Sequence, residues 1–240
     1  VVEGWRLEQI AEAVGRAGLP YGPTEFLQAA SYIPPDHPLA TELPGGASLE
    51  GFLFPDTYRL ETTGTAQDLV DSMLETFQLR VPGDQLQAFH AQGLLLYEAV
   101  TLASIVEREA IVPDERPLIA GVFLRRLRTG LPLESDPTVQ YALGQQPTGD
   151  WWKSPLTLVD LENASPYNTY HVTGLPPGPI ANPGRASLEA VLNPPATKEL
   201  FFVADGTGGH AFAETLEQHN KNVANWRKIQ KEKKDAGTGN

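Results

Sequence analysis

A glutamate lies on the apolar side of the most strongly helical segment of the chain. In a helix over residues 94–110, at about 100° per residue, Leu96 and Val100 share a side with Glu107, whereas Glu109 points about 160° away. Burial among apolar side chains disfavours the ionised form of a carboxyl group. We therefore expect Glu107 to keep a proton near neutral pH and to donate it as a general acid. The alternative is a structural glutamate at the edge of the core that reaches out to solvent or pairs with an arginine, for which Arg125 and Arg126 are the candidates.

Further polar and aromatic candidates follow along the chain. Tyr167, Asn168 and Tyr170 combine flat rings with amide and hydroxyl groups, which suits the binding of sugars, and the alternative is a structural loop closed by these side chains. Asp136 is a candidate by type for a second carboxylate, although an Asp-Pro pair is also typical of a helix start. His210 follows a glycine-rich turn and could either line a site or be purely structural.

The composition excludes several classes of protein. The 240 residues carry a formal net charge of −12, which disfavours a nucleic-acid binder that relies on a basic surface. Because the chain has no cysteine, disulfides, zinc-thiolate sites and thiol nucleophiles are excluded. The histidines lack the spacing of a zinc-hydrolase motif, and no G-x-S-x-G segment indicates a serine hydrolase. No apolar run approaches the roughly 20 residues that a transmembrane helix needs.

Apolar periodicity, caps and turn residues predict an α+β fold that is mainly helical, with short strands and a β-hairpin. A proline- and glycine-rich stretch predicts a division near residue 48. A small unit over residues 1–48 would precede a larger domain over residues 49–234 and a disordered tail over residues 235–240. We expect helices over about residues 5–15, 23–30, 65–80, 84–92, 94–110, 114–129 and 215–234, and a short helix that starts at residue 136. We expect strands before the first helix and over residues 52–54, 58–60, 200–204 and 211–213.

Several motifs, in order along the chain, are similar to those of one protein family. They are Leu49–Tyr58 (LEGFLFPDTY), Ala103–Glu109 (ASIVERE), Ser135–Tyr141 (SDPTVQY), Ser165–Tyr170 (SPYNTY), Gly174–Ile180 (GLPPGPI), Phe202–Gly206 (FVADG) and Gly209–Phe212 (GHAF). With them, the chain from about residue 49 to about residue 230 resembles the YceG-like endolytic murein transglycosylases, also called MltG. Residues 1–48 resemble the second half of the small LysM-like module that precedes the catalytic domain in that family.

The resemblance implies an enzyme that cleaves the β-1,4 bond between N-acetylmuramic acid and N-acetylglucosamine without water and leaves a 1,6-anhydro end. In the family the glutamate of the S-I-V-E-[KR]-E motif is taken as the catalytic acid/base, which by position is Glu107. With a single catalytic glutamate, the substrate's own N-acetyl oxygen could meet the positive charge that forms. No metal or organic cofactor is implied. The residues expected to bind the glycan are Tyr167, Asn168, Tyr170, Asp136, Ser104 and His210.

Two other functions stay open at this point. A muramidase would use the same glutamate with water as the acceptor, and a non-catalytic protein would bind peptidoglycan as a scaffold. The resemblance further implies a role in ending glycan-strand growth, and contacts with glycan polymerases or penicillin-binding proteins. It also implies an N-terminal transmembrane helix, outside this chain, that anchors an extracytoplasmic (periplasmic) domain to the inner or plasma membrane.

Overall fold

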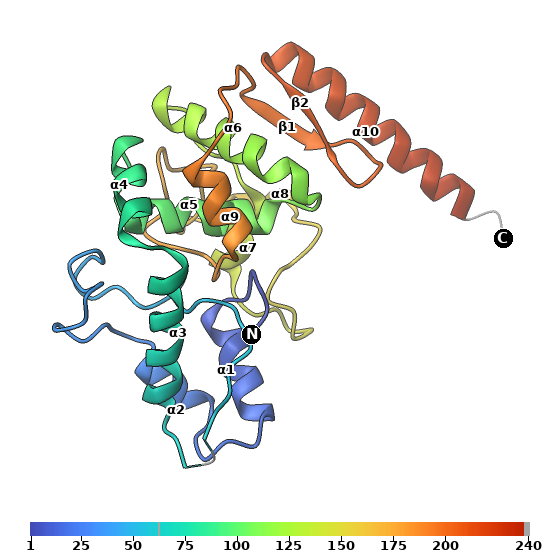
Figure 1. The fold of residues 1–240 in the computed structure, drawn as a ribbon. Helices are drawn as coiled ribbons and strands as arrows, with labels where there is room; N and C mark the ends of the chain where they lie inside the picture. Colours follow the sequence, from blue (N-terminus) through green and yellow to red (C-terminus); the bar gives the residue numbers. More distant parts are fainter. Residues whose placement is uncertain (62, 238–240) are drawn as a thin grey trace.

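The computed structural model describes residues 1–61 and 63–237 of the chain (Figure 1). It is mainly helical and contains a two-stranded antiparallel sheet, which confirms the predicted α+β class. The elements are α1 (Leu7–Arg16), α2 (Pro23–Ala29), α3 (Ala66–Arg80), α4 (Gly83–Ala91), α5 (Leu96–Glu109), the 3-10 turn η1 (Pro113–Glu115), α6 (Arg116–Arg128), α7 (Asp136–Leu143), α8 (Leu158–Leu161), α9 (Arg185–Leu192), β1 (Phe201–Ala204), β2 (His210–Ala213) and α10 (Leu216–Gly237).

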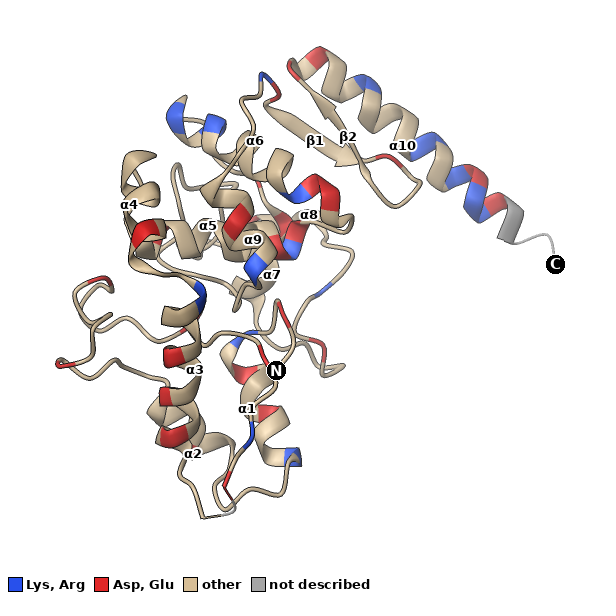
Figure 2. Cartoon of the chain, viewed as in Figure 1, with Lys and Arg blue, Asp and Glu red and all other residues tan. Residues whose placement is uncertain are grey.

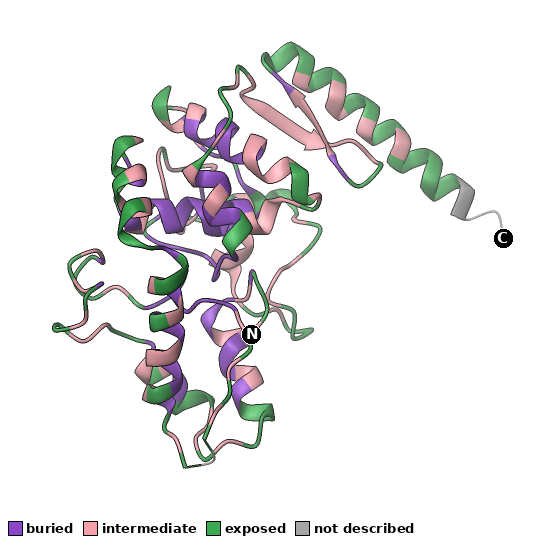
Figure 3. Cartoon of the chain, in the orientation of Figure 1, coloured by how far each residue is buried: buried purple, intermediate pink, exposed green. Residues whose placement is uncertain are grey.

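Helix α5 forms the centre of the larger domain, and α6 and α9 pack against it (Figure 3). Its residues from Ala99 to Val106 are all buried. The two polar side chains among them are satisfied internally, since Thr101 donates to the backbone carbonyl of Tyr97 and Ser104 donates to that of Thr101, both at 2.7 Å. A helix fixed on several sides in this way holds the residues at its carboxyl end in a defined position.

The N-terminal segment shares one apolar core with the rest of the protein. Leu7, Ile10 and Phe26, from α1 and α2, belong to the same buried cluster as Leu49 and Phe52. The core is therefore continuous across residue 48. The domain boundary near that residue and the LysM-like character of the N-terminal unit stay predictions.

The strands predicted over residues 52–54 and 58–60 are wrong, as is the strand predicted before α1. The apolar side chains of the first segment are buried as expected, but a side chain holds the backbone instead of a neighbouring strand. Asn182 Oδ1 accepts hydrogen bonds from the N–H groups of Gly51 and Leu53, both at 3.0 Å. Alternating apolar residues predict burial, whereas a strand also needs a partner for its backbone.

The start of α7 differs by one residue from the prediction. We expected Asp136 to cap the helix, but the N-cap residue is Ser135, and Asp136 and Pro137 are the first two helical residues. The carboxylate of Asp136 thus lies at a helix N-terminus, where the helix dipole favours a negative charge. The helix expected from Asp114 begins with η1 and continues as α6.

The C-terminal part consists of the β1–β2 hairpin and helix α10. Phe202 lies opposite Phe212 and Ala204 lies opposite His210 in the hairpin. Helix α10 packs against both strands and then extends away from the body of the molecule (Figure 1). Most of the Lys and Arg residues of α10 lie in its distal half (Figure 2). The helix includes residues 235–237, which were predicted to belong to the tail, and residues 238–240 of that tail lie outside the described residues.

Candidate active site

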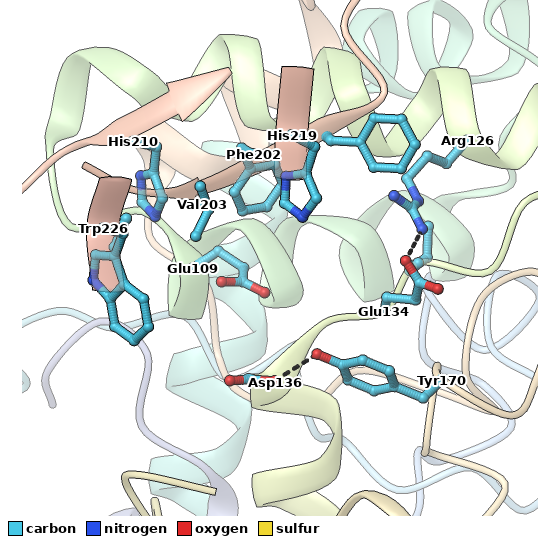
Figure 4. Close-up of a pocket in the computed structure, with 13 residues that line it drawn as sticks. Glu109, Arg126, Glu134, Asp136, Tyr170, Phe202, Val203, His210, His219 and Trp226 are labelled. Atoms are coloured by element: carbon cyan, nitrogen blue, oxygen red, sulfur yellow. Dashed lines mark hydrogen bonds and ion pairs between the residues drawn. The ribbon is translucent and has the colours of Figure 1, made fainter. Parts of the chain in front are cut away.

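A pocket lies where the carboxyl end of α5 and the start of α7 meet the hairpin and α10 (Figure 4). Its volume of about 440 Å³ is typical of small-molecule sites. Segments that are far apart in the sequence contribute to it, and three of the predicted site residues are among them. The lining residues are Glu109, Arg126, Leu133, Glu134, Asp136, Tyr170, Phe201, Phe202, Val203, Ala204, His210, His219 and Trp226.

Glu109 is the last residue of α5, and its side chain lies in this pocket. Ser135 Oγ donates a hydrogen bond to Glu109 Oε1 at 2.6 Å, whereas Oε2 has no hydrogen-bond partner among the described residues and is not sealed from solvent. Burial raises the pKa of Glu109 to about 7; the charge of Asp136 acts in the same direction, and Ser135 and Arg108 act against it. Such a carboxyl group can both release and take up a proton near neutral pH.

Asp136 lies on the opposite side of the pocket from the hairpin and is joined to Tyr170 (Figure 4). The Tyr170 hydroxyl donates a hydrogen bond to Asp136 Oδ1 at 2.7 Å. Burial, together with the neighbouring charge of Asp136, raises the pKa of the Tyr170 hydroxyl, which therefore stays a hydrogen-bond donor. The structure thus brings together two of the predicted glycan-binding residues, Asp136 and Tyr170.

The hairpin and α10 form the rest of the pocket wall. His210, at the start of β2, lines the pocket, and its Nδ1 lies 2.7 Å from Glu115 Oε2. Trp226 and His219 come from α10, and the ring of His219 stacks on Phe201 with centroids 5.2 Å apart. The pocket therefore combines carboxyl groups with imidazole and indole rings, a composition that suits a polar ligand with apolar faces, such as a sugar.

Glu107 is buried, as the helical periodicity predicts, but it is not among the described residues that line this pocket. Its side chain is only 6% exposed and its Oε1 lies 3.2 Å from Nη2 of Arg116, the first residue of α6. Its Oε2 accepts hydrogen bonds from the Gly184 N–H at 3.1 Å and from Ser187 Oγ at 2.7 Å. These contacts join α5 to α6 and α9. Glu107 does pair with an arginine, as in the structural alternative, but the partner is Arg116 and not Arg125 or Arg126.

Three further predicted residues also lie outside the lining of this pocket. Asn168 is fully buried and its Nδ2 donates to the carbonyls of Leu161 and Asn163, both at 2.8 Å. Ser104 is fully buried, and its Oγ accepts from the Ile180 N–H at 2.9 Å. The Tyr167 ring packs on that of Tyr141, with centroids 4.9 Å apart. Their predicted contact with a glycan stays a prediction, and their observed contacts shape loops of the domain.

Sequence reasoning missed Glu109 and Trp226 as lining residues of this pocket, and Ser135 as the hydrogen-bond donor to Glu109. Periodicity placed Glu109 on the polar side of its helix, which is also the side that faces the pocket. The adjacent Ser135-Asp136 pair was an available signal, because Asp136 lines the pocket and Ser135 binds the Glu109 carboxyl group from the same helix start. Trp226 lies in a segment of charged and polar residues, where no pattern indicates a pocket.

Comparison with known proteins identifies the family. A sequence profile described as the YceG-like family matches residues 1–225. The chain belongs to the YceG-like family. A protein of Bacillus subtilis named endolytic murein transglycosylase is 40% identical over 72% of this chain and 46% of its own length. A Streptococcus pneumoniae protein of the same name is 33% identical over 93% of this chain and 43% of its own length.

A solved structure supports the fold of this member of the YceG-like family. The crystal structure of a yceG-like protein from Listeria monocytogenes superimposes with a TM-score of 0.78 and is 33% identical, covering 92% of this chain and 73% of the other. The chain spans less than half the length of the two curated relatives. Among the described residues, no single helix has the length and apolarity to cross a membrane; α4 and α5 meet that requirement only together, and they are bent by 86°.

Proposed function

We propose that the chain is the catalytic part of an endolytic peptidoglycan lytic transglycosylase and that Glu109 is its acid/base. The observation that carries the proposal is the position of the Glu109 carboxyl group, which lines the pocket and is held there by Ser135. Burial raises its pKa to about 7, in keeping with this role. The names of the relatives in the YceG-like family support the substrate class. The geometry supports Glu109 better than Glu107. The Glu107 carboxyl group contacts Arg116 and the N-terminus of α9, and it does not line the pocket.

The reaction begins with protonated Glu109. Its Oε2 gives the proton to the oxygen that links N-acetylmuramic acid to N-acetylglucosamine, and the bond from that oxygen to the anomeric carbon breaks with both electrons on the oxygen. The substrate's N-acetyl oxygen meets the positive charge at the anomeric carbon, and the Asp136 carboxylate is a second source of negative charge. Ionised Glu109 then takes the proton of the C6 hydroxyl, and that oxygen bonds to the anomeric carbon. The product is a 1,6-anhydro end, and no water is consumed.

Product analysis with two matched glutamate variants tests this assignment. Glu109→Gln should lower the release of anhydro-muropeptides from purified peptidoglycan by at least about 10²-fold, the usual contribution of a general acid. Glu107→Gln should retain cleavage in its folded fraction. The reverse ranking would return the catalytic role to Glu107, the residue that the family resemblance indicates.

Mass spectrometry of the same digests separates the two alternative functions. Products of a muramidase are heavier than anhydro products by one water, and they would show that water is the acceptor. A non-catalytic scaffold would bind glycan strands but release no fragments. Because peptidoglycan lies outside the plasma membrane, the proposed activity places the chain on the extracytoplasmic face. Membrane anchoring, contacts with glycan polymerases and a role in ending strand growth belong to the same proposal.

A further inference from the structure

Glu115, which does not line the pocket itself, holds one of the side chains that do. It is the last residue of η1, and its Oε1 accepts a hydrogen bond from the His210 backbone N–H at 2.9 Å. Its Oε2 lies 2.7 Å from His210 Nδ1. The neighbouring residue is Gly209, where an added Cβ would lie 2.7 Å from Glu115 Oε1. One carboxylate therefore fixes both the backbone and the ring of His210.

The surroundings of His210 leave its other ring nitrogen directed to the pocket. Phe202 meets the imidazole edge-to-face, with centroids 5.3 Å apart and planes at 87°, and Phe212 lies on another side at 6.3 Å. The side chain of His210 is only 7% exposed, so its ring has little freedom to turn. Within the described part of the chain, Nε2 has no hydrogen-bond partner, and it is not sealed from solvent.

A carboxylate next to Nδ1 favours the imidazole tautomer that carries its proton on that nitrogen. Nε2 is then an acceptor, whereas the opposite tautomer would present a donor. We propose that Glu115 is a positioning residue that holds His210 in the Nδ1–H tautomer, so that Nε2 accepts a hydrogen bond from a hydroxyl or acetamido N–H of the bound glycan. The identity of the ligand rests on the proposed function, but the tautomer does not.

The tautomer can be measured without any enzymatic activity. Two-dimensional NMR of the ¹⁵N-histidine-labelled protein reports which ring nitrogen carries the proton, and the ¹⁵N shifts themselves identify the neutral ring. We expect the proton on Nδ1 in the wild type and in Glu115→Asp. In Glu115→Gln the carbonyl oxygen can still accept from the backbone, but the amide N–H₂ faces Nδ1, so the proton should move to Nε2. A wild-type signal with the proton on Nε2 would overturn the proposal.

Kinetics then test the contact with the glycan. Glu115→Gln should lower kcat/KM on purified peptidoglycan by about 10- to 100-fold, the loss expected for one hydrogen bond, while Glu115→Asp restores most of it. The control is Glu217→Gln, which makes the same chemical change at a residue whose side chain is 79% exposed on α10. Equal kcat/KM in Glu115→Gln and the wild type, despite a changed tautomer, would refute the contact. If the wild type cleaves no glycan while the NMR result is as expected, the proposed function fails and the Glu115–His210 assignment stands.

Discussion

The pH dependence of glycan cleavage tests the role of Glu109 through the groups that surround its carboxyl group. A general acid must carry its proton before the bond breaks, so cleavage should fall as the pH rises through the pKa of Glu109, about 7. With that pKa about half of the molecules are protonated at neutral pH, against roughly 0.3% at the ordinary value of 4.5. The protonated fractions differ by about 150-fold, which corresponds to about 3 kcal/mol.

The fall of cleavage at high pH forms the alkaline limb of the pH profile. Two single substitutions should move this limb in opposite directions. The hydrogen bond from Ser135 stabilises the ionised carboxylate, so Ser135→Ala raises the pKa of Glu109 and extends cleavage to higher pH. The charge of Asp136 disfavours the ionised form, so Asp136→Asn lowers the pKa of Glu109 and moves the limb to lower pH. Both displacements are smaller than the effect of burial, which is the largest cause of the raised pKa and remains in both variants.

The assay is kcat/KM for release of anhydro-muropeptides between about pH 5 and about pH 9. Thermal unfolding of each variant at each pH separates loss of the proton from loss of the fold. Glu107→Gln is the comparison variant, because it removes a buried carboxylate from the same helix without touching the pocket. Limbs that move in the same direction in Ser135→Ala and Asp136→Asn would refute the reasoning, as would a limb that moves only in Glu107→Gln.

Three other perturbations have defined outcomes. Trp226→Ala should raise KM by about 10-fold with little change in kcat, because it removes an apolar platform from the pocket but no reacting group, and steady-state kinetics on purified glycan measure this. Glu107→Gln should lower the free energy of unfolding in urea by about 2–3 kcal/mol, since it breaks a buried pair with Arg116. Burial raises the pKa of Glu50 from 4.5 to about 8, so its contribution to stability is greatest below 4.5 and falls by up to about 5 kcal/mol as the pH rises through 8. Urea unfolding across that range should have a flatter pH dependence in Glu50→Gln.

Local signals in the sequence were sufficient for most helices of the larger domain, but α8 and α9 were not predicted. Thr65 caps α3 by accepting from the Asp68 N–H, as the capping sequence predicts, and the apolar run of α5 is buried on several sides. The segment at residues 52–54 could not be assigned in this way. Its backbone partner, Asn182, lies 131 residues from Gly51 in the sequence, so nothing local distinguishes this loop from a strand.

The pocket could not be predicted from local sequence either, because residues far apart in the chain form it. Asp136, Tyr170 and His210 were candidates by residue type, and the fold places them in one cavity because α7, the loop after α8 and the hairpin meet there. Asn168 and Ser104 carry equally suitable groups, yet their polar atoms are engaged by the backbone. Residue type alone does not reveal whether a polar side chain is already satisfied within the protein.

The two glutamates of α5 differ because of the helix ends that surround them. Glu109 is the last residue of α5, where the carbonyl ends of the helix dipole disfavour a negative charge, and burial acts in the same direction. Glu107 faces the N-terminus of α9, whose N-cap residue Gly184 donates its N–H to Oε2, and its Oε1 lies 3.2 Å from Arg116 Nη2. A helical projection ranks residues by the side they occupy and contains no information on which helix ends lie near them. Two carboxyl groups on one helix can therefore be suited to different tasks: Glu107 joins three helices, and Glu109 is the group that we propose exchanges a proton with the substrate.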